Sequence, residues 1–168
     1  MAKTAITETI EYALFDNYYL KKSQRCALEV SVPKAGRCDF VAMSNDYTKE
    51  SDVVYTAIEI KTSKSDFKSK HGHNLDWAHK NYYATTPDLV DYIRENVPKH
   101  IGIIEVSNIE FSRNTTANEL RNDKHYTEVR IVKPAKTLKQ DYTPYFRRAI
   151  RENIFTANCS NIRTLLKK

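Results

Sequence analysis

Three stretches of strand-like sequence follow one another in the first part of the chain, and they constrain the fold more than any other feature. Apolar and polar side chains alternate along residues 26–32, which places Leu28 and Val30 on one predicted face. The two later stretches span residues 37–44 and 53–62, and the second of these is rich in Val, Tyr, Thr and Ile. Turns, not helices, separate the three stretches. We therefore expect an antiparallel meander.

Helical and strand-like segments alternate along the rest of the chain. Residues 4–19 carry Ile6, Ile10 and Leu14 on one face of a predicted amphipathic helix. The other predicted elements are helix 65–70 with Ser65 as N-cap, a helical stretch beginning near Asn74 or Asp76, strand 82–84, helix 88–96, strand 101–106, strand 128–132 and helix 145–157. Residues 108–124 show no interpretable pattern. The order α-β-β-β-α-β predicts one α/β domain over residues 1–168, a mixed β-sheet flanked by helices.

Positive charge is concentrated near the C-terminus. The formal net charge is +6, whereas residues 130–168 hold ten basic and two acidic side chains and so carry +8, which leaves −2 for the first 129 residues. The predicted C-terminal helix, about 143–168, is therefore basic. This asymmetry favours a polyanionic partner, and DNA is the partner that we expect.

Cysteine use and hydropathy indicate the compartment. Cys26, Cys38 and Cys159 are an odd number and include no C-x-x-C pair, which favours a reducing environment. No apolar run approaches the roughly 18 residues of a membrane span. We expect a cytoplasmic protein with no membrane partner.

Opposite charges lie in the middle of the third predicted strand. A period of two places Glu59 and Lys61 on one face and directs Ile60 into the core. Asp39 interrupts the apolar run of the second strand, where aspartate is disfavoured. If these strands are neighbours, the three charged side chains converge. Two carboxylates suit a hard divalent cation such as Mg²⁺, while a lysine can orient water and neutralise charge on a phosphate.

This arrangement resembles the signature of the PD-(D/E)XK nuclease superfamily, an aspartate on one strand followed by Glu-x-Lys on the next. Longer segments are similar to MmcB-like DNA repair proteins of that superfamily: Glu29, Arg37-x-Asp39, the run Ile-Glu-Ile-Lys-Thr-Ser-Lys-Ser-Asp-Phe at 58–67, the aromatic segment 82–87, and 102–106. The resemblance covers about residues 26–106, and a weaker similarity extends over residues 129–136. Cys38 stands where the superfamily has the proline of its Pro-Asp pair.

The resemblance implies a restriction-endonuclease-like core and Mg²⁺-dependent hydrolysis of DNA phosphodiester bonds, with Mn²⁺ as a substitute metal. The process would be DNA repair, restriction or phage DNA processing. The resemblance places the metal at Asp39, Glu59 and Ile60. The implied catalytic residues are Asp39, Glu59, Lys61, Glu29 and Glu11.

The last two of these glutamates are alternatives for a further carboxylate. Members of the superfamily often add a glutamate from the first helix, where Glu8 lies nearly opposite the apolar face and Glu11 lies on its flank. Glu29 projects from the polar face of the first predicted strand, toward the side where Asp39 and Glu59 are expected.

Several basic side chains are candidates for contacts with DNA phosphates: Arg37, Lys64, Lys80, Arg147, Arg148 and Arg151. Four alternatives remain open at this stage. The charged triplet could be a structural ion-pair network, and His71, His73 and His79 could form a zinc site. The domain could be a catalytically silent nucleic-acid-binding module on the same fold, or an interaction subunit without nucleic-acid contacts. A homodimer is also compatible with the sequence.

Overall fold

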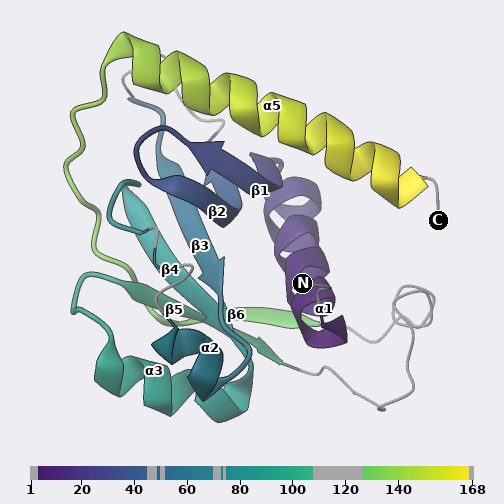
Figure 1. Cartoon of the computed structure of the whole chain (residues 1–168), viewed down its shortest axis with the longest axis vertical. Helices are drawn as coiled ribbons and strands as arrows, with labels where there is room; N and C mark the ends of the chain where they lie inside the picture. Colours follow the sequence, from purple (N-terminus) through teal and green to yellow (C-terminus); the bar gives the residue numbers. More distant parts are fainter. Residues whose placement is uncertain are drawn as a thin grey trace.

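A six-stranded mixed sheet, with its strands side by side in chain order, organises the part of the protein that the structure describes (Figure 1). The structure is a computed structural model, and it describes residues 4–44, 49, 52–69, 73, 75–107 and 127–166. Strands β1, β2 and β3 are antiparallel neighbours, β3, β4 and β5 are parallel, and β6 is antiparallel to β5. The predicted meander, the mixed sheet and the α/β class are confirmed.

The strands and helices lie close to their predicted positions. The strands are β1 (Arg25–Val32), β2 (Gly36–Met43), β3 (Tyr55–Ile60), β4 (Lys80–Thr85), β5 (Gly102–Ser107) and β6 (Glu128–Lys133). The helices are α1 (Ala5–Phe15) with the π-helical η1 (Asp16–Lys21), α2 (Lys64–Lys68), the 3₁₀ turn η3 (Pro87–Leu89), α3 (Val90–Asn96) and α5 (Pro144–Leu166). In these described segments, no helix is both long and apolar enough to cross a membrane.

Helix α1 covers one face of the sheet. The Thr4 side chain caps its N-terminus by accepting a hydrogen bond from the Thr7 N–H at 3.2 Å. Ile10 is fully buried and packs in one cluster with Ile58 and Ile60 of β3. Ile60 therefore points into the core, as the sequence predicts.

The hairpin of β1 and β2 changes faces at Glu29. Leu28 packs against the cluster beneath α1, whereas Val30, two residues later, belongs to the cluster on the opposite face. Cys38 and Phe40 show the same change on β2. Glu29 has a φ of 56°, outside the range of extended strands, so the two-residue alternation is interrupted there. The prediction of one continuous face for Leu28 and Val30 is therefore wrong.

Helix α5 covers this opposite face and also the free edge of β1 (Figure 1). Ile150 and Ile154 are buried in the core cluster. Three asparagines hydrogen-bond the main chain of β1: Asn153 Nδ2 to the Ser31 carbonyl (2.7 Å), Asn158 Nδ2 to the Cys26 carbonyl (2.6 Å) and Asn161 Oδ1 from the Leu28 N–H (3.0 Å). These contacts pair groups that an edge strand otherwise leaves open. The predicted helix is confirmed: α5 extends beyond the periodic stretch 145–157 and lies within the broader bounds of about 143–168.

Two local predictions are wrong. The N-cap of α2 is Ser63, whose hydroxyl accepts a hydrogen bond from the Asp66 N–H at 3.0 Å, and not Ser65. No helix begins near Asp76, because the described residues 75–79 form an irregular segment in which Asp76 has a φ of 74°. Asn74 and the uninterpretable stretch 108–124 lie outside the described residues.

Candidate functional site

Strands β2 and β3 bring the two predicted carboxylates together. Phe40 pairs with Ile58 in antiparallel register, which places Asp39 beside Glu59. Asp39 Oδ2 accepts a hydrogen bond from the Ile60 N–H at 2.8 Å, so the aspartate is attached to the main chain of the strand that carries the glutamate. The predicted convergence is present in the fold.

The Glu59 carboxylate is buried and unusually short of partners. Its exposed fraction is 0%, and neither carboxylate oxygen has a hydrogen-bond partner among the described residues. Burial raises the pKa of Glu59 to about 8, and the charge of Asp39 adds to the effect, while the Lys61 ammonium opposes it. Without a further cation, this carboxyl group takes up a proton more readily than an ordinary glutamate.

Asp39 is the partly exposed member of the pair. Burial raises its pKa, the hydrogen bond from Ile60 lowers it, and the charge of Glu29 raises it again. Both carboxyl groups thus have raised pKa values. This is the behaviour of two acids that share a poorly solvated space.

Lys61 is held in place from two sides. Its N–H donates to the Ala84 carbonyl at 2.9 Å, and its carbonyl accepts from Thr85 Oγ1 at 2.7 Å, so β4 fixes its main chain. Its Nζ lies 3.5 Å from the Asp66 carbonyl oxygen and 3.6 Å from Asp66 Oδ1. The side chain is only 3% exposed. The charge of Lys61 lowers the pKa of both Asp39 and Glu59, which shows that the three predicted residues act on one another.

The further glutamates occupy different places. Glu29 acts on Asp39 through its charge and pairs with Arg37 Nε at 2.7 Å. Glu11 is buried on α1, which packs on the face of Ile58 and Ile60, whereas Glu59 projects from the opposite face. Glu8 is half-buried on the same helix. Of the three alternatives, the structure brings Glu29 into electrostatic reach of the pair.

The residues at this point suit a small divalent cation. Two carboxylates are held side by side, and when Glu59 is ionised its two buried oxygens lack a positively charged hydrogen-bond partner among the described residues. Ile60 can contribute only its main-chain carbonyl, because its side chain is in the core and its N–H is bonded to Asp39. Within the described residues, no group of three or more histidine, cysteine, aspartate or glutamate side chains could hold a metal. Mg²⁺ commonly uses one or two carboxylates and retains several waters, so two are sufficient.

The histidines offer little to a metal. His73 Nε2 donates to the Phe67 and Ser69 carbonyls at 2.9 and 2.8 Å, and its Nδ1 is bonded to the Tyr83 hydroxyl. His79 Nδ1 accepts from the Tyr55 N–H at 3.0 Å. His71 lies outside the described residues.

Asp66 and Tyr83 also contact the site, and neither was predicted to do so, although both belong to segments on which the family resemblance rests. Asp66 holds the Lys61 ammonium, and its Oδ2 also accepts from the Thr62 N–H at 3.2 Å. Tyr83 pairs with Glu59 across β3 and β4. Burial raises the pKa of Tyr83 to about 12, and the charge of Glu59 contributes. The run Lys-Ser-Asp-Phe and the tyrosine pair of β4 are the sequence signals that could have identified these two residues.

The predicted phosphate contacts are dispersed. Arg37 pairs with Glu29, and Arg148 pairs with Glu152 at 2.8 Å. The charged groups of Lys64 and Arg147 lie 5.1 and 5.7 Å from the ring centroids of Tyr92 and Tyr142, respectively. Lys80 begins β4, and Arg151 is half-buried on α5. Arg147 Nε also donates to the Tyr142 carbonyl at 3.2 Å, so this side chain is directed toward the sheet. Arg37 lies beside the carboxylates through its contact with Glu29.

Comparisons with known proteins establish the fold alone. No family model matches the chain, and no curated protein matches it. Among solved structures, the chain is similar to a protein of unknown function from Silicibacter pomeroyi, with a TM-score of 0.61, 16% sequence identity, and coverage of 98% of this chain and 93% of that chain. The shared fold therefore extends over nearly the whole of both chains, while function must be argued from the site.

Proposed function

We propose that the protein is a divalent-cation-dependent nuclease that hydrolyses DNA phosphodiester bonds. Asp39 and Glu59 hold the cation, and Lys61 is the positioned ammonium group. The observation that carries the proposal is the buried Glu59 carboxylate, unpartnered within the described residues and held against a second carboxylate. When both groups are ionised, such a pair is costly unless a cation neutralises it. The resemblance of Asp39 and Glu59-x-Lys61 to the PD-(D/E)XK signature supports the same conclusion.

Each side chain has a distinct task in this proposal. When bound, Mg²⁺ or Mn²⁺ supplies Lewis-acid chemistry at a phosphate oxygen and makes a bound water more acidic. The Lys61 ammonium, anchored by Asp66, orients the attacking water and neutralises charge that develops on the phosphate. Asp39 is partly exposed, so substrate approaches from its side, where Arg37 can contact a neighbouring phosphate.

One observation favours a second function, a catalytically silent DNA-binding module. Glu59 is 0% exposed and the Lys61 side chain is 3% exposed, so two of the three central side chains are closed to solvent. With a pKa of about 8, Glu59 is mostly protonated at neutral pH, and a neutral carboxyl group can remain buried without a metal.

A cleavage assay separates the two functions. Supercoiled, linear and branched DNA are incubated with the protein in Mg²⁺ or Mn²⁺, with EDTA as control. We expect metal-dependent cleavage by the wild type, and we expect Lys61→Ala to abolish it while leaving DNA affinity within a few fold, because one charge is a small part of the footprint. Glu105→Gln is the matched control, because Glu105 is a buried strand carboxylate with its own partner, Arg130 at 2.8 Å. DNA binding without cleavage of any substrate would support the silent module.

A further inference from the structure

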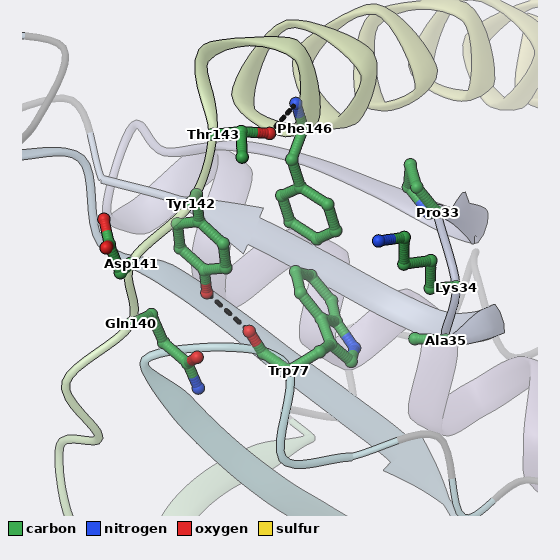
Figure 2. A pocket seen from close by; sticks show the side chains of 9 residues that line it. All are labelled: Pro33, Lys34, Ala35, Trp77, Gln140, Asp141, Tyr142, Thr143 and Phe146. Atoms are coloured by element: carbon green, nitrogen blue, oxygen red, sulfur yellow. Dashed lines mark hydrogen bonds between the residues drawn. The ribbon is translucent and has the colours of Figure 1, made fainter.

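An aromatic pocket of about 320 Å³ lies between the tip of the β1–β2 hairpin, the segment before β4 and the start of α5 (Figure 2). The rings of Trp77, Tyr142 and Phe146 line it. Tyr142 and Phe146 are parallel with centroids 4.9 Å apart, and the Trp77 ring is 6.4 Å from Phe146. The volume is at the lower end for small-molecule sites, which suits one flat ring system.

The walls of this pocket are fixed by contacts within the protein. The Tyr142 hydroxyl donates to the Trp77 carbonyl, and Gln140 Nε2 donates to the Asp76 and Ala78 carbonyls at 2.9 and 3.1 Å. The Tyr142 ring also packs edge-on against Tyr55 of β3 at 5.6 Å. A pocket that is already organised loses little entropy when a ligand enters it.

The polar groups around the rings indicate which ligand fits. Trp77 Nε1 is buried and has no hydrogen-bond partner among the described residues, so the indole offers the pocket its ring and not its N–H. Lys34 is exposed at the hairpin tip, and Figure 2 shows its ammonium group directed toward the Phe146 ring. Arg147, at the back of Tyr142, adds a second positive charge. Asp141 is the acidic lining residue, and in Figure 2 its side chain points away from the three rings.

The pocket and the carboxylate pair lie on the same face of the sheet. Tyr55, which touches the pocket wall, precedes Glu59 by four residues on β3, so their side chains project to one side. At about 3.3 Å per residue, they are roughly 13 Å apart along the strand. A DNA strand held at the pocket can therefore extend along this face to the carboxylate pair.

We propose that this pocket binds one unstacked base of single-stranded DNA while the strand continues toward Asp39. The inference rests on the proposed function and names its substrate class. The face of Phe146 turned away from Tyr142 stacks a base of any sequence, and Lys34 contacts the adjacent phosphate. The two nearby cations, Lys34 and Arg147, favour a nucleotide over a neutral peptide.

Trp77 is the single tryptophan of the chain, and it lines the pocket. Tryptophan fluorescence therefore reports on this site alone. The experiment titrates Asp39→Asn protein in EDTA with a short oligothymidylate, an abasic oligomer of equal length, a blunt duplex and a neutral proline-rich peptide. We expect quenching by the oligothymidylate and not by the abasic oligomer, the duplex or the peptide. The Asp39 substitution keeps the DNA intact and leaves the pocket unaltered.

Affinity measured by fluorescence anisotropy of labelled oligothymidylate gives the second readout. Phe146→Ala should weaken binding by about 5- to 150-fold, the usual effect of losing one base-stacking ring. Phe155→Ala, which removes an exposed phenylalanine of the same helix outside the pocket, should leave affinity unchanged. Lys34→Gln changes an exposed side chain and should weaken binding by a few fold even if Phe146→Ala folds poorly.

The outcomes distinguish this inference from the proposed function. Equal quenching by the abasic oligomer, or quenching by the peptide alone, would overturn the base-binding assignment. Metal-dependent cleavage by the wild type without any change in fluorescence would contradict base binding in the pocket and support the nuclease function. Quenching without cleavage would support base binding in the pocket of a DNA-binding module and contradict the nuclease function.

Discussion

The buried Glu59 carboxyl group makes a specific prediction about stability in the absence of metal. Its pKa is about 8 in the folded protein, against 4.5 as the ordinary value. Because the folded-state pKa is the higher one, this group stabilises the fold fully below about pH 4.5, and the contribution is lost as pH rises through about 8. We therefore expect the metal-free protein to become less stable between pH 5 and pH 8.

The magnitude follows from the difference between the two pKa values. At about 1.4 kcal/mol per pKa unit, the loss amounts to at most about 5 kcal/mol of unfolding free energy. The charge of Asp39 contributes to the raised pKa of Glu59, so the loss belongs to the pair of carboxyl groups. For a chain of this size, each kcal/mol corresponds to about 2–4 °C in Tm. The full effect would lower Tm by about 10–20 °C.

Urea unfolding at several pH values in EDTA measures this effect. Glu59→Gln, which is neutral at every pH, should remove most of the slope between pH 5 and pH 8, because Gln cannot release a proton. Glu105→Gln, at a buried strand position with an arginine partner, should retain the wild-type slope. Parallel pH profiles for the wild type and Glu59→Gln would refute the argument that Glu59 is buried as a protonated acid.

Two further predictions concern the C-terminal helix and the core. Arg148→Ala with Arg151→Ala should reduce the slope of log affinity against log salt for duplex DNA by up to about two, with little change in Tm. Arg94→Ala, which removes a comparable arginine paired with Asp91 on α3, should leave the slope unchanged, and an unaltered slope in the double variant would place DNA binding elsewhere. Gly102→Ala should destabilise the fold by about 1–3 kcal/mol in urea unfolding, because the added Cβ would lie 2.3 Å from the Tyr82 ring and 2.6 Å from the Ala135 main-chain nitrogen. Wild-type stability of Gly102→Ala would show that β4 and β5 are not packed this closely.

The sequence predicted those elements whose pattern is local. The strands and the amphipathic helices show periodicities that a short window contains, and Asp39, Glu59 and Lys61 follow from strand alternation once the meander is assumed. The change of faces at Glu29 could not be predicted, because a non-glycine residue with a φ of 56° has no sequence signal of its own. The Ser63 cap depends on which side chain finds a partner in the folded chain.

Tertiary contacts created the remaining features of the site. The three residues of the hairpin tip, Trp77 and the start of α5 are far apart in the sequence, so the aromatic pocket exists only after α5 crosses the sheet. The complete burial of Glu59 likewise arises from packing on both sides of β3, not from its place in the strand. The superfamily resemblance, which supplies the nuclease hypothesis, remains a prediction from motifs and element order.

The central claim is that Asp39 and Glu59 form a divalent-cation site, and calorimetric titration with Mn²⁺ tests it most directly. Metal binding requires ionised carboxylates, and Glu59 holds a proton at neutral pH when its pKa is about 8. At pH 7, in buffers of different ionisation enthalpy, we expect wild-type binding to release close to one proton per Mn²⁺. Glu59→Gln should bind more weakly and release none. Unchanged Mn²⁺ affinity and proton release in Glu59→Gln would contradict the assignment.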